Sequence, residues 1–177
     1  MKMGNPGDGT SIQINGIPVV LNNLKSGDEL HFDGKFWRNY PAAPSFATPN
    51  TFTPNDPAGT SSATAVMMGL GSTVNFTPKT YGSVMLTLDG LMTNASDNMY
   101  LTIAYGTGAA PVNGAAASGT AVGSTLYYYG GTAFSKAVII TGLTPGTAYW
   151  FDAQVRVAAI GTAVLQALTA TVQELIR

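Results

Sequence analysis

The fold class is decided by the stretch Tyr149-Trp150-Phe151-Asp152-Ala153-Gln154-Val155-Arg156-Val157. From Phe151 onward every second residue is apolar, and polar residues occupy the positions between them. An alternation with a period of two residues places one set of side chains in a core and the other at a surface, as in a half-buried β-strand. Residues 84–89 alternate in the same way. The sequence therefore predicts strands with one buried face.

The region 61–177 contains a series of such runs separated by turn signals. The expected strands cover residues 65–70, 73–77, 83–91, 99–105, 120–129, 137–141, 148–158 and 163–175. Asp89-Gly90 and Gly130-Gly131 are among the dipeptides that indicate turns. Helix propensity offers an alternative for the last run, but its threonines and Val172 favour a strand. We expect an all-β domain at 61–177, an antiparallel β-sandwich or jelly roll.

Residues 1–40 predict a small β-hairpin module. Asn15-Gly16 separates two short apolar runs and suits a two-residue type I′ hairpin turn. Pro18 in the second run indicates a sheet edge, because proline cannot donate to a ladder. A second hairpin is expected from Glu29 to Asn39, with its turn at Asp33-Gly34-Lys35. Strands this short bury little surface, so the module needs a partner surface or further copies of itself.

Residues 41–60 hold five of the ten prolines of the chain. The remaining residues there are mostly small or polar, and prolines prefer extended, polyproline-like conformations. The segment is therefore predicted to be a stiff Pro-rich linker between the N-terminal module and the β-sandwich.

Composition excludes several function classes. Eight Lys and Arg residues against nine Asp and Glu residues give a net charge of −1, and the basic residues are scattered, so nucleic-acid binding is not expected. The chain has no cysteine, which excludes thiolate metal sites, thiol nucleophiles and disulfides. The N-terminus has no apolar run of the signal-peptide kind, and the longest uncharged stretch, 98–135, contains seven glycines. We expect a protein that is soluble when made, with no membrane insertion.

Few residues are candidates for catalysis or metal binding. His31 is the only histidine, and metal sites and nucleophile–base pairs usually need several. The carboxylates that a glycosidase pair would require are Asp89, Asp97, Asp152 and Glu174, but their spacing supports structural roles. We expect no catalytic residue, no metal ligand and no cofactor.

The most specific local motif runs from Leu143 to Tyr149. It contains Leu143, Pro145, Gly146 and Tyr149, and it resembles the Leu-x-Pro-Gly-x-x-Tyr corner of fibronectin type III domains. In such a tyrosine corner the hydroxyl bonds back to the upstream backbone. The resemblance implies a structural role for Tyr149 in a β-sandwich, and it does not by itself give a function.

Three consecutive tyrosines, Tyr127, Tyr128 and Tyr129, precede Gly130-Gly131. Exposed tyrosine suits contact with a sugar or a protein, because the ring is apolar and the hydroxyl is polar. In one reading these residues contact a receptor or a glycan. In the other, which we favour, Tyr127 and Tyr129 pack inward or at a subunit contact and only Tyr128 lies outside.

Two segments together resemble virion fibre and decoration proteins of tailed bacteriophages. The first is residues 24–39, with the pattern Leu, Gly-Asp-x-Leu, an aromatic residue, Asp-Gly and Trp-x-Asn. The second resembles the C-terminal β domain of many phage structural proteins, in the segments Met67–Gly71, Phe76–Pro78, Tyr105–Gly108 and Gly142–Asp152. The first segment lies in the N-terminal module and the others are spread over the downstream region, and these two regions make up most of the chain outside the linker.

The resemblance implies a non-enzymatic virion protein, a trimeric head fibre, spike or capsid decoration. Its partners would be further copies of itself, other capsid or tail proteins and a host-surface glycan or protein. A tail-fibre receptor-binding or carbohydrate-binding module is the alternative, and a polysaccharide depolymerase would require converging carboxylates. We expect Phe32, Phe36 and Trp37 to attach the N-terminal module to the particle, because aromatic residues serve well as interface anchors.

Overall fold

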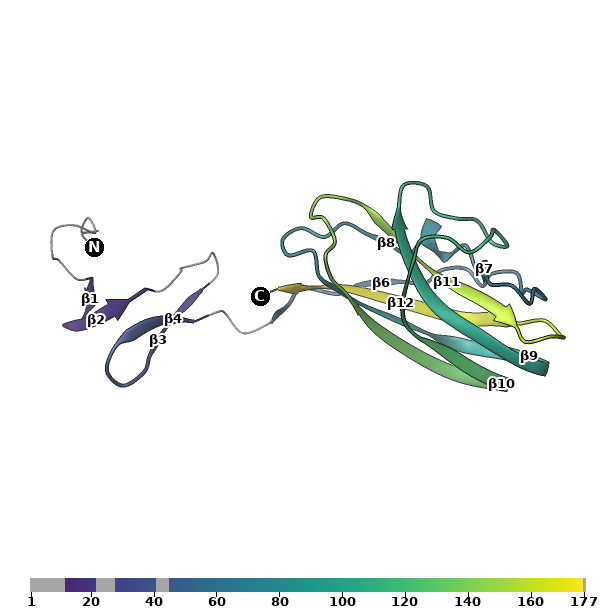
Figure 1. Cartoon of the computed structure of the whole chain (residues 1–177), viewed down its shortest axis with the longest axis horizontal. Coiled ribbons are helices and arrows are strands. Elements are labelled where there is room, and N and C mark those ends of the chain that lie inside the picture. Colours follow the sequence, from purple (N-terminus) through teal and green to yellow (C-terminus); the bar gives the residue numbers. More distant parts are fainter. Residues whose placement is uncertain (1–11, 22–27, 41–44, 177) are drawn as a thin grey trace. The chain divides into compact units, whose positions relative to one another are not determined.

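The computed structural model describes residues 12–21, 28–40 and 45–176. The chain divides into two compact units, one ending at Ser45 and one from Phe46 to Ile176 (Figure 1). Every regular element in the described residues is a strand except one short 3₁₀ turn, η1, at Leu70–Ser72. The all-β prediction is therefore confirmed.

The first unit contains a four-stranded sheet in the order β1-β2-β4-β3. Its strands are β1 (Gln13–Ile14), β2 (Ile17–Val20), β3 (Glu29–Phe32) and β4 (Trp37–Tyr40). Asn15 and Gly16 have φ values of 51° and 76°, which confirms the type I′ hairpin turn between β1 and β2. The second hairpin, β3–β4, is also confirmed.

The expectation that Pro18 marks a sheet edge is wrong. Strand β2 lies between β1 and β4, which it pairs in parallel. The pairing with β4 involves Val19 and Val20 only. Pro18 precedes these residues, so its missing N–H removes no hydrogen bond from the ladder to β4.

The second unit is an eight-stranded sheet that curls into a sandwich. Its strands are β5 (Ser45–Phe46), β6 (Asn50–Phe52), β7 (Val66–Met67), β8 (Asn75–Phe76), β9 (Val84–Thr107), β10 (Thr120–Ile140), β11 (Tyr149–Val157) and β12 (Val164–Ile176). The main path runs β5-β12-β9-β11-β7, and β10 pairs with the other edge of β9. The last run is thus a strand, as its threonines indicated.

Two long strands join the layers of the sandwich. Strand β10 follows β9 along nearly its whole length, with register shifts at Val122/Leu126 and at Tyr129/Gly130. The first half of β9 pairs with β12, and the second half pairs with β11. We call β12 and the half of β9 that pairs with it the first layer, and we call β11 and the other half of β9 the second layer. Strand β10 extends along both layers beside β9. Apolar side chains from both layers form one buried core, among them Leu86, Leu101, Phe151, Val155 and Val172.

The predicted turns at Asp89-Gly90 and Gly130-Gly131 are wrong, because both dipeptides lie within strands. The expected strands 83–91 and 99–105 are one strand, β9, and the expected strands 120–129 and 137–141 are one strand, β10. A Cβ at position 90 would lie 2.7 Å from Leu168 Cδ2, so glycine provides room for core packing there. Gly130 has a φ of 77° and adjoins the register shift where β10 passes between the layers.

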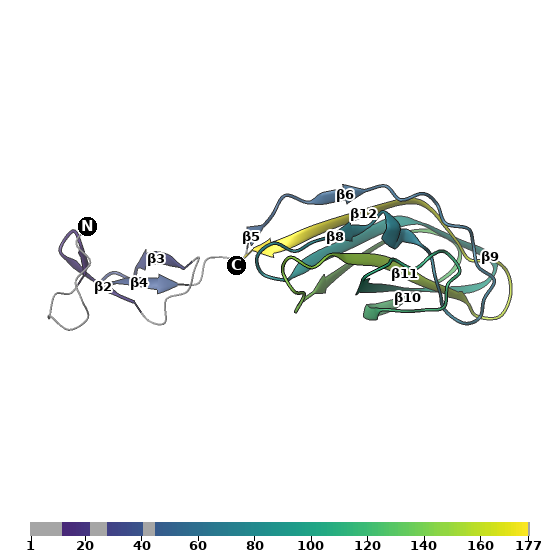
Figure 2. The same ribbon diagram turned by 90° about the horizontal axis from the view of Figure 1, so that it is seen from above.

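The predicted linker is wrong for residues 46–60, and residues 41–44 lie outside the described residues. Strand β6 pairs antiparallel with β12, and Thr60 forms a bridge with Ala163. Figure 2 shows β6 running alongside β12. Prolines tolerate this position because an edge strand leaves part of its donor row unpaired. The N-terminal segment of the second unit is therefore part of the sandwich.

Candidate functional site

A row of three side chains crosses the outer face of the second layer. Tyr127 of β10, Tyr100 of β9 and Arg156 of β11 are direct partners across the strands. The ring centroids of Tyr100 and Tyr127 lie 5.2 Å apart, and the Arg156 guanidinium carbon lies 3.7 Å from the Tyr100 centroid. We call these three residues, together with the exposed Tyr129 two positions along β10, the tyrosine row. An aromatic surface with a stacked cation is a typical binding arrangement.

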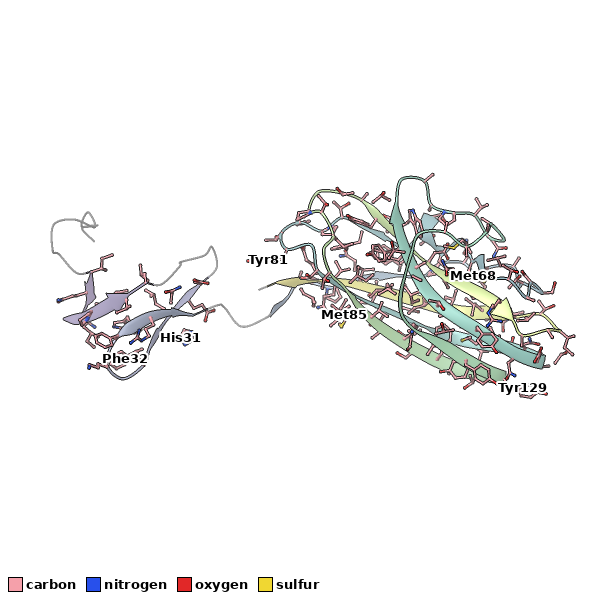
Figure 3. The ribbon with its side chains drawn as sticks, viewed as in Figure 1. His31, Phe32, Met68, Tyr81, Met85 and Tyr129 are labelled. Carbon is pink, nitrogen blue, oxygen red and sulfur yellow. The ribbon has the colours of Figure 1, made fainter. Side chains whose placement is uncertain are left out.

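The tyrosine row is open to solvent. Tyr127 is 58% exposed and Tyr129 is 66% exposed. In Figure 3, Tyr129 lies toward the end of the sandwich opposite Tyr81. Polar groups adjoin the row. The hydroxyls of Thr102 and Thr125 are hydrogen-bonded to each other at 2.9 Å, and Thr102 is two positions along β9 from Tyr100. The surface therefore combines ring faces with hydroxyl groups.

The other end of the same outer face is covered. The loop between β9 and β10 packs over Trp150, which is buried. A Cβ at Gly106 or at Gly119 would lie 2.4 Å from the indole ring, so the backbone approaches it closely. Gln154 Nε2 also donates to the Ser118 carbonyl at 3.0 Å. The loop thus covers the Trp150 end of the face and leaves the tyrosine row accessible.

The favoured orientation of the three consecutive tyrosines is wrong. Tyr128 packs against the hydrophobic core, while Tyr127 and Tyr129 lie outside. The reason is the alternation of β10, in which Leu126 packs against the core and Phe134 and Val138 are buried, which places even-numbered residues inward.

Tyr100 and Arg156 were not predicted as site residues. A signal was present, since Tyr100 stands between the core residues Met99 and Leu101. Arg156 likewise stands between Val155 and Val157. Alternation directs both side chains outward, but the in-register alignment of three strands could not be deduced from one sequence.

The structure contains the tyrosine-corner contact. The backbone N–H of Thr144 donates to the Tyr149 hydroxyl at 3.0 Å. The ring packs against the core beside Tyr105, with centroids 6.2 Å apart. Leu143 is buried, Pro145 and Gly146 are exposed, and Gly146 has a φ of 81°. This motif positions the entry into β11.

The first unit exposes an aromatic surface. The rings of Phe32 and Trp37 are 5.5 Å apart across β3 and β4. Phe32 is 47% exposed, and Leu30, on the same face of β3, is 42% exposed. The ring of Phe36 has other neighbours, the charged ends of Lys35 and Arg38, each 5.2 Å from its centroid. Two of the three predicted attachment residues are therefore brought together.

The turn of this hairpin is held by Asp33. Its carboxylate accepts hydrogen bonds from Arg38 Nε and from the backbone N–H groups of Phe36 and Lys35. These contacts, with Arg38 the largest contributor, lower the pKa of Asp33 to about 2. Among the described residues, no acceptor faces the buried Trp37 Nε1–H. His31 pairs with Glu29 at 3.0 Å and is exposed.

Three of the four carboxylates weighed as acids each bind the backbone of a different loop. The Asp152 carboxylate accepts hydrogen bonds from the backbone N–H groups of Gly69 and Leu70. The Glu174 carboxylate accepts hydrogen bonds from the backbone N–H groups of residues 79–81. Asp97 accepts from Ala159 and Ile160 in the β11–β12 loop. These contacts support structural roles for the three residues.

The pKa values of these carboxyls differ in direction. Burial raises the pKa of Asp152 to about 6, against its backbone hydrogen bonds. Burial also opposes ionisation of Glu174, but hydrogen bonds from Thr80, Lys79 and Tyr81 hold its pKa below the ordinary value. Hydrogen bonds, the largest from Asn98, lower the pKa of Asp97.

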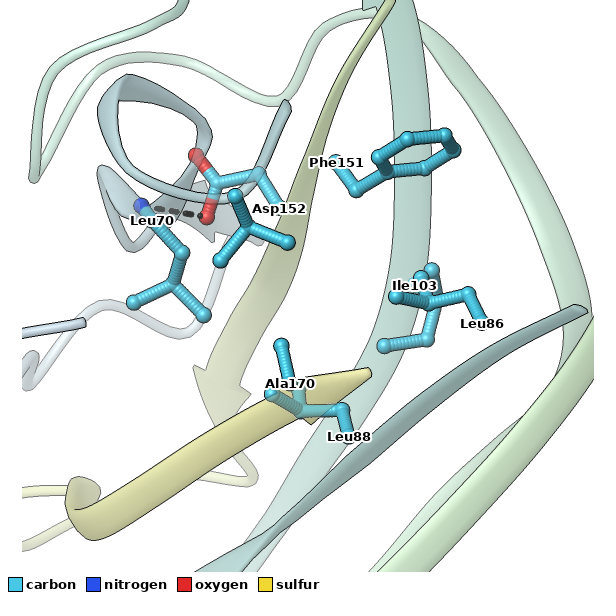
Figure 4. Close-up of a pocket in the computed structure, with 8 residues that line it drawn as sticks. Leu70, Leu86, Leu88, Ile103, Phe151, Asp152 and Ala170 are labelled. Atoms are coloured by element: carbon cyan, nitrogen blue, oxygen red, sulfur yellow. Dashed lines mark hydrogen bonds between the residues drawn. The ribbon is translucent and has the colours of Figure 1, made fainter. Parts of the chain in front are cut away.

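A small cavity inside the sandwich adjoins Asp152 (Figure 4). Its lining is otherwise apolar and includes Leu86, Ile103 and Phe151. The space measures about 10 Å³, roughly the room that one water molecule needs. Figure 4 shows the Leu70 N–H bonded to the carboxylate beside it. The cavity is a packing defect of the core and has no room for an organic ligand.

The described residues contain no group of three or more His, Asp or Glu side chains arranged to hold a metal ion. Within the same residues, no helix has the length and apolar character needed to cross a membrane.

No protein-family model matches the chain, and comparison with curated proteins also gave no match. Among solved structures, the chain is similar to a chain of the structure of infectious bursal disease virus, Gx strain, with a TM-score of 0.41 and 12% identity. That alignment covers 82% of this chain and 37% of the viral chain. A functional proposal therefore rests on the residues of this protein.

Proposed function

We propose that the chain is a non-enzymatic structural protein of a bacteriophage particle, a head fibre, spike or capsid decoration. Its first unit attaches to the particle, and its β-sandwich is displayed to the surroundings. The observation that supports this division is the presence of two separate units, the smaller of which exposes an aromatic face. The sequence resemblance of residues 24–39 to phage virion modules agrees with it.

The aromatic face of the first unit supports an attachment role. Leu30, Phe32 and Trp37 lie on one face of its sheet, and Leu30 and Phe32 keep much of their area exposed. Large exposed apolar side chains on so small a sheet are costly unless a partner covers them. Aromatic residues of this kind dominate the binding energy of many interfaces. The partner in this proposal is another virion protein.

Self-association into a homotrimer belongs to the same proposal. The outer face of the first layer carries Ala137, Thr87 and Thr171 in register, followed by a row with Ile139 and Met85. Ile139 is 59% exposed. Gln173 completes the second row, so these two rows hold small, apolar and uncharged polar side chains, which can pack against another copy without burying charge. Light scattering should give the mass of a trimer, and a stable monomer at micromolar concentration would contradict this part.

The attachment role is tested by incorporation into particles. We expect the double variant Phe32→Ala, Trp37→Ala to remain folded in its second unit and to be absent from purified virions. Tyr81→Ala is the matched control, since Tyr81 is an exposed aromatic residue of the other unit. Full occupancy of the double variant on particles would refute the assignment.

The tyrosine row favours a second candidate, a receptor-binding or carbohydrate-binding role of the sandwich. Its rings and adjoining hydroxyls suit such contacts. This role is compatible with the first, because attachment and recognition would use different units. The structural roles of Asp97, Asp152 and Glu174 support a protein without hydrolytic activity, which a polysaccharide-degradation assay tests.

A further inference from the structure

We propose that the tyrosine row binds an acidic polysaccharide, with Tyr127 and Tyr129 stacking on sugar rings and Arg156 pairing with a sugar carboxylate. This inference deepens the second candidate above and rests on the proposed display of the sandwich. It adds Arg156 and Tyr100 to the site and assigns the charge of the ligand.

The geometry of the row matches an extended chain of sugars. Tyr127 and Tyr129 are two positions apart on β10, so their rings point to the same face about 7 Å from each other. The site is an open surface, and a surface of this kind can contact internal sugars of a polymer as well as its ends. Tyrosine offers an apolar ring for the sugar face and a hydroxyl for its polar groups.

The surroundings favour a saccharide over a protein partner. Neighbouring positions on the same face hold Thr102 and Thr125, whose hydroxyls are bonded to each other. These side chains offer hydroxyl groups to a sugar. The core of a protein–protein interface is usually apolar, whereas hydroxyl groups border this row.

Arg156 determines the charge of the ligand. Tyr100 supports its guanidinium from one side by the cation–π contact. Within the described residues, the hydrogen bond recorded for this guanidinium is to the Val157 carbonyl, at the long distance of 3.5 Å. A guanidinium carries five N–H donors in a planar fork that matches a carboxylate. A sugar carboxylate on the tyrosine row would therefore find donors already oriented.

The test is binding of the purified full chain to an array of neutral oligosaccharides and of oligosaccharides containing uronate or sialate. We expect binding to carboxylated glycans that weakens as salt is raised, because exposed charge pairs are screened. Tyr127→Ala should weaken that binding at least tenfold. Arg156→Gln should abolish the preference for acidic over neutral glycans.

Tyr81→Ala is the matched control and should bind as the unaltered chain does, since Tyr81 is an exposed tyrosine far from the row along the sandwich. Absence of binding to every carboxylated glycan on the array would overturn the proposal. Binding that neither Tyr127→Ala nor Arg156→Gln changes would also overturn it. Failure here is distinguishable from failure of the proposed attachment, because particle incorporation depends on the first unit and is measured separately.

Discussion

The hydroxyl of Tyr149 makes a single contact whose energetic value can be measured directly. It accepts the Thr144 N–H at 3.0 Å, and Thr144 lies at the surface. We expect Tyr149→Phe to lower the free energy of unfolding by about 0.5–1.5 kcal/mol, the net value of one ordinary hydrogen bond. Urea denaturation measures the change. Tyr81→Phe is the control, and equal stabilities of both variants would show that the corner contact contributes nothing.

Asp152 should make stability depend on pH in an unusual direction. Its pKa in the folded chain is about 6, above the ordinary value of 3.8, because the carboxyl is buried. Folding therefore favours the protonated form. The stabilisation from this group is complete below pH 3.8, falls as the pH rises toward 6, and is lost above it. A difference of about two pKa units corresponds to about 3 kcal/mol, as an order of magnitude.

Asp152→Asn removes this titration. We expect the unfolding free energy of the variant, relative to the unaltered chain, to rise between pH 4 and pH 6 by up to about 3 kcal/mol. Glu174→Gln provides the opposite sign, because the lowered pKa of Glu174 makes its contribution present at neutral pH and lost in acid. Denaturation curves at several pH values measure both. Parallel pH profiles for Asp152→Asn and the unaltered chain would contradict the assigned burial effect.

At the scale of elements, the long strands depend on glycines that act by their size. A Cβ at Gly90 would lie 2.7 Å from Leu168 Cδ2 and 3.0 Å from the Gln166 carbonyl oxygen. Gly90→Ala should therefore destabilise the sandwich by about 1–3 kcal/mol through overpacking. Gly131→Ala is the matched control within β10, since its Cβ would come no closer than 3.5 Å to Thr93 Cγ2. Thermal denaturation compares the two, and an equal loss from both would refute the packing argument.

Gly90 also shows which part of the fold could not be predicted from the sequence. Alternation correctly predicted β11, whose odd-numbered residues from Phe151 to Val157 are buried. Threonines and Val172 correctly favoured a strand over a helix for β12. Asp89-Gly90 has the composition of a turn, and glycine there is explained by close contact with Leu168 and with the Gln166 carbonyl, which are far from Gly90 in the sequence. A long-range contact of this kind leaves no local signal.

The candidate site was also predictable only in part, because local patterns can be read from the sequence and long-range contacts cannot. The local pattern identified the three tyrosines 127–129 as candidates but assigned the wrong ones to the surface, since Tyr128 is the one that packs inward. The outward positions of Tyr100 and Arg156 follow from alternation on their own strands. The row exists because the registers of β9, β10 and β11 align these residues. Register between strands distant in sequence depends on the assembled core, which one sequence does not reveal.

At the scale of the whole molecule, the boundary between the two units is the feature that sequence composition misplaced. Prolines at 49, 54 and 57 suggested a spacer, yet Pro54 is buried and residues 46–60 belong to the second unit. Ala47 exchanges hydrogen bonds with β12, donating its N–H to the Glu174 carbonyl at 3.0 Å and accepting from Gln173 Nε2 at 2.8 Å. Composition describes which backbone conformations are available, whereas pairing with β12 determines which one is used.

Two truncated proteins test whether residues 46–60 are a spacer or a part of the sandwich. Removal of residues 1–44 deletes the four strands of the first unit and keeps β5, β6 and their pairing with β12, so the sandwich should unfold at the same temperature as in the full chain. Removal of residues 1–60 also deletes Phe52, which packs against the core, and the Thr60–Ala163 bridge. That loss should cost about 2 kcal/mol or more, equivalent to a melting midpoint lower by about 5 °C or more. Scanning calorimetry on both proteins measures the difference. If residues 46–60 acted only as a spacer, the two truncated proteins would melt together, and the edge strand β6 would contribute nothing to the stability of the sandwich.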